Sequence, residues 1–142
     1  GNCGKHSHYD RQSFAYDFKM PIGSYVTAMR SGKVLAIKDQ SRDGTNNTDS
    51  LNYIVILHED STFGRYLHLT QNGSLVKRGQ YVNAGDSIAL SGNSGVSTEP
   101  HLHVDITAYC TKAPCQTIPF SFKNCEDKVP IQGRSYTALK KD

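Results

Sequence analysis

The sequence predicts an all-β protein built of two packed, mostly antiparallel sheets, and three observations support this fold class. Short stretches rich in β-branched and aromatic residues alternate with turn residues along most of the chain, as in sandwiches and barrels. Glycines punctuate the second half of the sequence at nearly even spacing between short apolar stretches. The 3.6-residue periodicity of an amphipathic helix is hard to find anywhere.

The first predicted strands lie close together in the sequence. Residues 25–29 form one strand, and Ser31-Gly32 turns the chain into a second strand over residues 33–37. The polar stretch that follows, residues 39–50, has the composition of a loop.

The middle of the chain predicts a hairpin, and a later segment predicts a core strand. Residues 52–58 are β-branched and apolar enough for a central strand, and residues 59–61 turn it into a strand over residues 62–69. Residues 101–107 alternate in polarity and are expected to form the final core strand.

Composition excludes several classes of protein. A chain of 142 residues has the length of one domain, and its net charge of +3 is a weak bias towards anionic partners that does not indicate nucleic-acid binding. The longest apolar run is far shorter than the roughly 18 residues of a membrane span, so none is predicted.

Four cysteines, at positions 3, 110, 115 and 125, indicate an oxidising compartment. Their even number favours disulfides, and no C-x-x-C spacing signals a redox motif or a zinc ribbon. Of three possible pairings we favour Cys110 with Cys115 and Cys3 with Cys125. The chain starts at Gly1 without a leader, so an exported protein would have had its signal peptide removed.

A strand carries the densest group of chemically active residues. Side chains alternate along a strand, so His101, His103 and Asp105 share one face while Leu102 and Val104 point into the core. An H-x-H pair on a rigid strand can build a metal site or can belong to an ordinary sheet. Asp105 either orients an imidazole or is an exposed strand carboxylate, and the residues leave both open.

Two further polar residues have two interpretations each, and a third candidate lies near one of them in the sequence. Asp17, inside the apolar run Tyr16-Asp17-Phe18, is either a capping residue in a turn or an oxygen ligand for zinc. His8 lies nine residues upstream, and His68 lies between two leucines as either a core histidine or a functional one. A zinc hydrolase needs three protein ligands, a water and a nearby base, and this chain holds enough candidates.

Several segments, in the same order along residues 7–107, resemble the lysostaphin-type zinc endopeptidases, the LytM-like peptidases of bacterial cell walls. The final S-T-x-P-H-L-H pattern is the most specific of them. The matching segments are Ser7-His8, Phe14–Phe18, Pro21–Gly23, Tyr66–Leu69, Val76–Ile88, Gly92–Gly95 and Ser97–His103.

The resemblance implies a set of site residues. The family's zinc ligands correspond to His8, Asp17 and His103, which would hold one Zn²⁺ per chain. Its catalytic histidines correspond to His68 and His101, and which of them acts as the base stays open. These residues would converge in a groove across one of the two sheets.

This sequence departs from the usual family pattern at two places. Most members space the first ligands as H-x-x-x-D, which here would put the histidine at Ser13. A longer spacing, found in one branch of the family, matches His8, with His6 as the rival. Glu99 stands where the family usually has glycine before Pro-His, a change expected to alter the substrate groove.

The resemblance implies a secreted zinc metalloendopeptidase that hydrolyses peptide bonds of peptidoglycan with a metal-activated water. We expect a monomer that works in the periplasm or outside the cell on peptidoglycan peptides, without nucleic acid. The alternative is an inactive module that binds wall peptides or activates an amidase. The scissile bond stays open.

The resemblance also implies how the chain is divided. Residues 1–107 would form the peptidase core. Residues 108–142 would form an irregular C-terminal extension that packs on the same domain, against the start of the chain.

Overall fold

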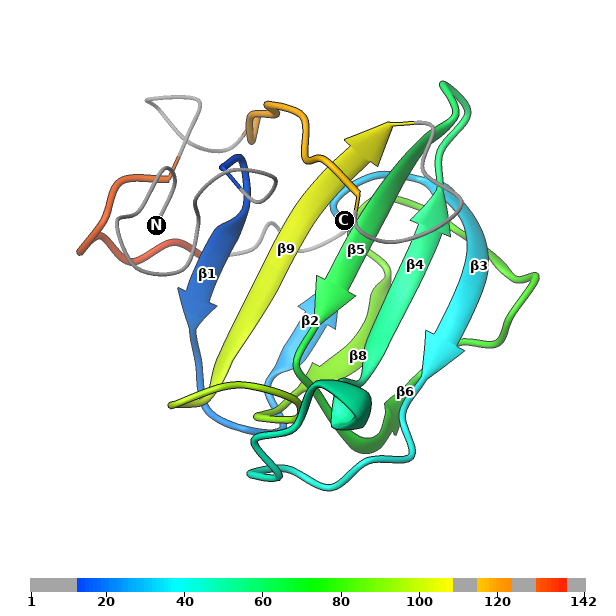
Figure 1. Cartoon of the computed structure of the whole chain (residues 1–142). Helices are drawn as coiled ribbons and strands as arrows, with labels where there is room; N and C mark the ends of the chain where they lie inside the picture. Colours follow the sequence, from blue (N-terminus) through cyan, green and yellow to red (C-terminus); the bar gives the residue numbers. More distant parts are fainter. Residues whose placement is uncertain (1–12, 109–114, 124–129, 138–142) are drawn as a thin grey trace.

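Two antiparallel sheets account for the strands of the computed structural model, which describes residues 13–108, 115–123 and 130–137 (Figure 1). The six-stranded sheet contains, in spatial order, β1 (Tyr16–Lys19), β9 (His101–Ala108), β5 (Thr62–Leu67), β4 (Tyr53–Leu57), β3 (Gly32–Lys38) and β7 (Tyr81–Val82). The three-stranded sheet contains β2 (Tyr25–Thr27), β8 (Ser87–Ser91) and β6 (Leu69–Ser74). The predicted fold class is confirmed.

Most of the predicted strands are present with small changes at their ends. β4 lies inside the larger sheet, as its β-branched composition predicts, and β9 covers the expected final strand. The only helical element in the described residues is the 3₁₀ turn η2 (Thr48–Ser50), within the predicted loop. No helix in this part of the chain is long and apolar enough to cross a membrane.

The hydrophobic core lies between the two sheets. Ile54, Ile56 and Tyr66 enter it from the larger sheet, and Val26 and Ile88 enter it from the smaller one, all essentially buried. Burying a side chain of this size contributes about 1.5–3 kcal/mol, so this layer is the main stabilising feature of the fold.

Part of the predicted C-terminal extension covers β1. The ring of Phe120 packs edge-on against Tyr16 with centroids 5.1 Å apart, and Phe122 packs likewise against Phe18 at 5.8 Å. The amide of Ile118 also donates a hydrogen bond to the carbonyl of a β9 residue. These contacts hold the start of the described chain next to β9, while the division at residue 107 stays a prediction.

The cysteine pairings also stay predictions. Cys115 is disulfide-bonded. The other three cysteines, at positions 3, 110 and 125, lie outside the described residues.

His58 is buried at the end of β4, remote in the sequence from the histidines of β9. Its Nδ1 donates to the carbonyl oxygen of Ser31 at 2.9 Å, while Nε2 finds no hydrogen-bond partner among the described residues. Burial lowers the pKa of His58, because a charged imidazole would lose its hydration there. The side chain is therefore neutral and structural.

His58→Asn tests this assignment, because the asparagine amide can replace the Nδ1 donor without titrating. The unfolded chain takes up a proton at His58 near pH 6.5 but the folded protein does so only at lower pH. The wild type therefore loses stability as the pH falls from 7 to 5, at about 1.4 kcal/mol for each pKa unit of difference. Chemical denaturation at both pH values should show a smaller loss for the variant; parallel losses would contradict the assignment.

Candidate active site

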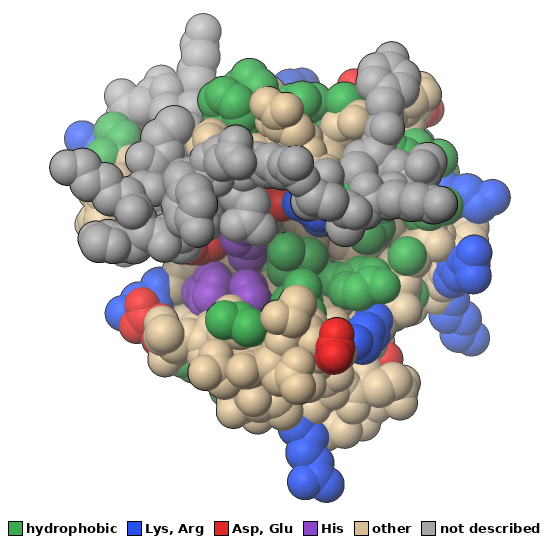
Figure 2. Space-filling model, in the orientation of Figure 1, with side chains coloured by type: hydrophobic (Ala, Val, Ile, Leu, Met, Phe, Trp, Pro, Cys, Tyr) green, Lys and Arg blue, Asp and Glu red, His purple; other side chains and the backbone are tan. Residues whose placement is uncertain are grey.

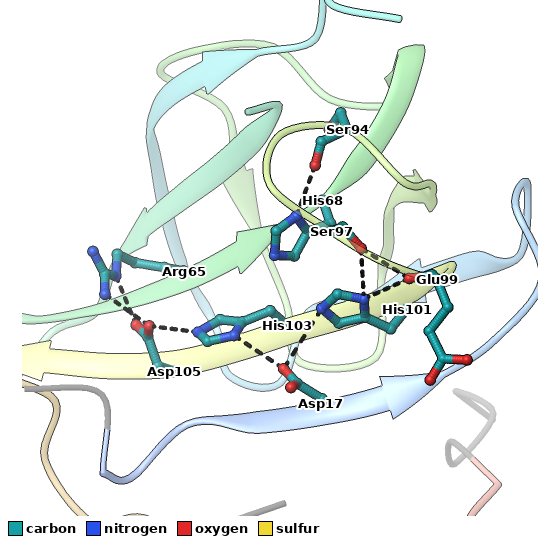
Figure 3. Close-up of polar contacts among 9 residues, drawn as sticks. All are labelled: Asp17, Arg65, His68, Ser94, Ser97, Glu99, His101, His103 and Asp105. Carbon is teal, nitrogen blue, oxygen red and sulfur yellow. Dashed lines mark hydrogen bonds and ion pairs between the residues drawn. The ribbon is translucent and has the colours of Figure 1, made fainter. Parts of the chain in front are cut away.

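Strand β9 lies between β1 and β5 and brings together polar side chains from all three strands (Figure 3). Asp17 of β1 is the cross-strand neighbour of His103, so both side chains lie on the same face of the sheet. The Nδ1 atom of His103 lies 3.0 Å from Oδ1 of Asp17, and the Nε2 atom of His101 lies 3.8 Å from the same oxygen. Asp17 is therefore a strand residue within the histidine cluster, and the turn interpretation is wrong.

His68 reaches this cluster from a corner of the chain. The prediction of one strand over residues 62–69 is wrong, because the chain leaves the six-stranded sheet after Leu67 and enters the three-stranded sheet at Leu69. His68 lies between them with φ of +63°, a left-handed conformation that is uncommon outside glycine and is found at functional sites. This corner turns its ring towards β9.

The ring of His68 is held in one orientation. Its Nδ1 lies 2.7 Å from the carbonyl oxygen of Ser94, which can only accept, so Nδ1 carries the proton. Its centroid lies 4.5 Å from that of His101 and 6.1 Å from that of His103. Burial lowers the pKa of His68 to about 4, because the charged form would be desolvated. At neutral pH it is an uncharged ring with a lone pair at Nε2.

The ring of His101 shows the same tautomer. Its Nδ1 lies 2.8 Å from the carbonyl oxygen of Glu99 and 3.1 Å from the hydroxyl of Ser97. The carbonyl again requires a proton on Nδ1, which leaves the lone pair of Nε2 directed towards Asp17. Two neighbouring imidazoles thus present proton-accepting nitrogens to one place.

Asp105 is fully buried, which decides between its two interpretations in favour of orienting an imidazole. Its Oδ2 lies 3.1 Å from Nε2 of His103, and Arg65 of β5 binds the same carboxylate through two hydrogen bonds of 2.7 Å. Burial alone would raise the pKa of Asp105, but the hydrogen bonds from His103 and Arg65 outweigh it and lower the pKa. For His103, burial alone would lower the pKa, but the hydrogen bonds to Asp105 and Asp17 outweigh it and raise the pKa.

Four of the five predicted site residues are therefore brought together, namely Asp17, His68, His101 and His103. Figure 2 shows histidine side chains gathered at one place on the molecular surface. The fifth, His8, and its rival His6 lie outside the described residues. Within the described ranges, no group of three His, Cys, Asp or Glu residues is arranged to hold a metal ion.

Comparison with known protein families finds a match that covers most of the chain. The model of peptidase family M23 matches residues 11–114. The chain belongs to peptidase family M23. His6 and His8 precede the matched segment, so the match does not choose between them.

Individual M23 relatives show how far the similarity extends. The chain is 42% identical to the peptidoglycan DD-endopeptidase ShyA of Vibrio cholerae over 90 residues, 63% of this chain and 19% of that protein. The catalytic domain of lysostaphin from Staphylococcus simulans is 33% identical, with a TM-score of 0.57 and 71% of each chain covered. A zinc-containing peptidase from Vibrio cholerae is 41% identical, with a TM-score of 0.52, covering 63% of this chain and 25% of that one. The chain spans about a fifth of the length of the curated relatives it matches.

A buried hydrogen-bond network supports the corner of this M23 chain at His68, and the sequence did not predict it. Asn52 is fully buried, and its side-chain amide donates to the carbonyls of Ser41 and Leu69. The Ser94 hydroxyl donates to the same Leu69 carbonyl at 2.7 Å and accepts from the backbone N–H of Asn52 at 3.1 Å. These hydrogen bonds link Leu69, which follows His68 in the chain, to Ser94, whose carbonyl contacts the His68 ring. No sequence pattern predicts that Asn52 is buried.

Glycine is required in the loop that carries Ser94. A Cβ atom at Gly92 would lie 2.3 Å from the backbone nitrogen of Thr70 and 2.5 Å from Oδ1 of Asp43. The carboxylate of Asp43 accepts from the Asn93 amide and from the Thr70 hydroxyl, both at 2.5 Å. The close approach of loop and strand at Gly92 positions the Ser94 carbonyl for His68.

The unusual Glu99 lies at the edge of the cluster. Its carboxylate forms an ion pair of 2.7 Å with Lys19, the cross-strand neighbour of His101, and both side chains are largely exposed. Such a pair contributes little stability, because water screens it. A hollow lined by Lys19, Met20, Pro21 and Pro100 lies beside it. The Glu99 side chain thus lies on the surface next to the histidines, and its effect on the substrate groove stays a prediction.

Proposed function

We propose that this chain is a zinc-dependent endopeptidase that hydrolyses peptide bonds of peptidoglycan. The observation that carries the proposal is the convergence of His68, His101, His103 and Asp17 from three separate segments of an M23 chain. The names of the relatives support the substrate, since ShyA is a peptidoglycan DD-endopeptidase. The zinc-containing structure among them supports the metal.

The chemistry of Asp17 and His103 suits a divalent cation. When Nε2 of a neutral His103 donates to Asp105, its Nδ1 is an acceptor that faces another acceptor, Oδ1 of Asp17, at 3.0 Å. Two lone pairs at that distance repel each other unless a proton or a cation lies between them. Zinc prefers imidazole nitrogen and carboxylate oxygen, so Asp17 and His103 would hold it together with His8. A bound zinc ion supplies a Lewis acid that polarises a carbonyl group and makes water more acidic.

The remaining residues handle protons. The Nε2 lone pairs of His68 and His101 can each accept a proton from a water molecule and later return it to the leaving amine. The carbonyls of Ser94 and Glu99 keep both rings in the required tautomer. Peptide hydrolysis needs both transfers, and two adjacent imidazoles can provide them.

The proposed substrate also determines the proposed location. Peptidoglycan lies outside the cytoplasmic membrane, so we place the protein in the periplasm or outside the cell, as a monomer with one zinc ion. The disulfide-bonded Cys115 is consistent with an oxidising compartment.

Chelation of the purified protein tests the proposed function. Cleavage of purified sacculi, followed by mass spectrometry of the released fragments, should stop when the metal is removed and return when zinc is added back. The fragments also identify the scissile bond. Sacculi bound but not cut by the zinc-loaded protein would favour the alternative, a wall-binding module; cleavage unaffected by chelation would exclude a zinc mechanism.

The third zinc ligand is tested by comparing His8→Ala with His6→Ala. We expect His8→Ala to lose bound zinc in elemental analysis and His6→Ala to retain about one ion per chain, since a zinc hydrolase site requires three protein ligands. The two variants are matched controls for each other, because they lie two residues apart. Zinc loss in His6→Ala alone would reverse the assignment.

A further inference from the structure

Arg65 is a charged residue that the proposed chemistry does not use. It lies on β5 directly opposite Asp105 of β9 in the sheet register. Its Nε donates to Oδ1 and its Nη2 to Oδ2 of that carboxylate, each at 2.7 Å, and the arginine side chain is only 20% exposed. This two-point contact holds the plane of the carboxylate, which a single hydrogen bond would leave free to rotate.

The carboxylate held by Arg65 contacts His103. Oδ2 of Asp105 lies 3.1 Å from Nε2 of that ring, and the carboxylate is fully buried. Figure 3 shows the resulting chain of contacts from Arg65 through Asp105 and His103 to Asp17. An ionised carboxylate only accepts, so the proton of a neutral His103 has to be on Nε2 for this contact to form.

Two carboxylates thus compete for the one proton of a neutral His103. Asp105 accepts it at Nε2, and Asp17, 3.0 Å from Nδ1, would accept it in the other tautomer. Only the first tautomer has a lone pair on Nδ1 that can bind a cation beside Asp17. The orientation of the Asp105 carboxylate therefore decides whether the ring is ready for metal.

We propose that Arg65 is a positioning residue for zinc binding: by clamping Asp105 it keeps the His103 proton on Nε2 and the Nδ1 lone pair facing Asp17. This inference rests on the proposed function, because it assumes that Asp17 and His103 bind zinc. Contacts of this kind behind a metal-binding histidine are worth about 10- to 100-fold in metal affinity.

Zinc affinity, measured by competition with a chromogenic chelator, tests the inference. Arg65→Lys keeps the charge but cannot form the two-point contact, and we expect it to bind zinc about 10-fold more weakly than the wild type. Asp105→Asn should lose more, since arginine can take the amide oxygen and leave the NH₂ group facing Nε2. Arg30→Met is the matched control, because Arg30 pairs with the exposed Asp60 away from the cluster, and its affinity should be that of the wild type.

A second readout separates positioning from general stability. In the zinc-loaded wild type, the Nε2 proton of His103 should exchange slowly with solvent in NMR spectra of ¹⁵N-histidine-labelled protein, and at least 10-fold faster in Arg65→Lys. Thermal unfolding confirms that each variant is folded. Wild-type zinc affinity or wild-type exchange in folded Arg65→Lys would overturn the inference. Absence of zinc binding by the wild type would instead overturn the proposed function.

Discussion

We expect His103→Ala to abolish zinc binding and to lower peptidoglycan cleavage by at least about 1000-fold, the largest effect of any single substitution. The expected magnitude follows from the several kcal/mol that a metal ion contributes to stabilising a transition state, at about 1.4 kcal/mol for each factor of ten. His103 faces Asp17 at 3.0 Å and is buried beside Asp105, so alanine removes the nitrogen that would bind the cation together with Asp17.

Elemental analysis and fragment release from sacculi measure the two losses together. His58→Asn is the control, because it also replaces a buried histidine but at the far end of β4, and it should keep both zinc and activity. A His103→Ala protein that stays folded and retains one tightly bound zinc ion would show that the metal is held elsewhere.

His68→Ala gives the second largest effect, but with a different signature. We expect the turnover number to fall by about 100- to 10 000-fold, the usual contribution of an acid–base group, while zinc content and KM change little. The reason is geometric: the His68 ring lies 4.5 Å from His101 but points its lone pair into the site and is not next to Asp17 as His103 is. Single-turnover kinetics with a defined wall peptide separate the turnover number from binding.

The corner at His68 requires a check on folding in that experiment. The residue has a positive φ, so alanine adds a modest backbone cost, and His68→Asn is a second variant that tolerates this conformation better. Both variants should lose turnover equally. Full activity of His68→Asn would mean that the corner, and not the imidazole, is needed.

Much of the architecture could be predicted from local patterns. β4 and β9 are recognisable because residues 53–57 are apolar and β-branched and residues 101–107 alternate, and both signals arise within one strand. β1 and the break between β5 and β6 could not be predicted. β1 forms because it pairs with β9. The break occurs at His68, whose left-handed backbone interrupts a run of residues that has the pattern of one continuous strand.

The candidate site divides in the same way. His101 and His103 share a face because side chains alternate along a strand, and this can be predicted from their spacing in the sequence. Asp17 joins them only through the register of β1 with β9. Resemblance to a family placed Asp17, His68 and His8 in the site, whereas the residues alone left Asp17 and His68 with two interpretations each. The place of His8 stays a prediction.

The fold class, the histidine pair on one strand face and the shortness of the apolar runs can be predicted from the sequence, because each is a property of neighbouring residues. The burial of Asp105 against Arg65, forty positions away, and the support that Asn52 gives to the corner at His68 become visible only in the folded chain. Burial and hydrogen bonding of a polar side chain depend on which segments pack together. No local pattern of residues encodes that.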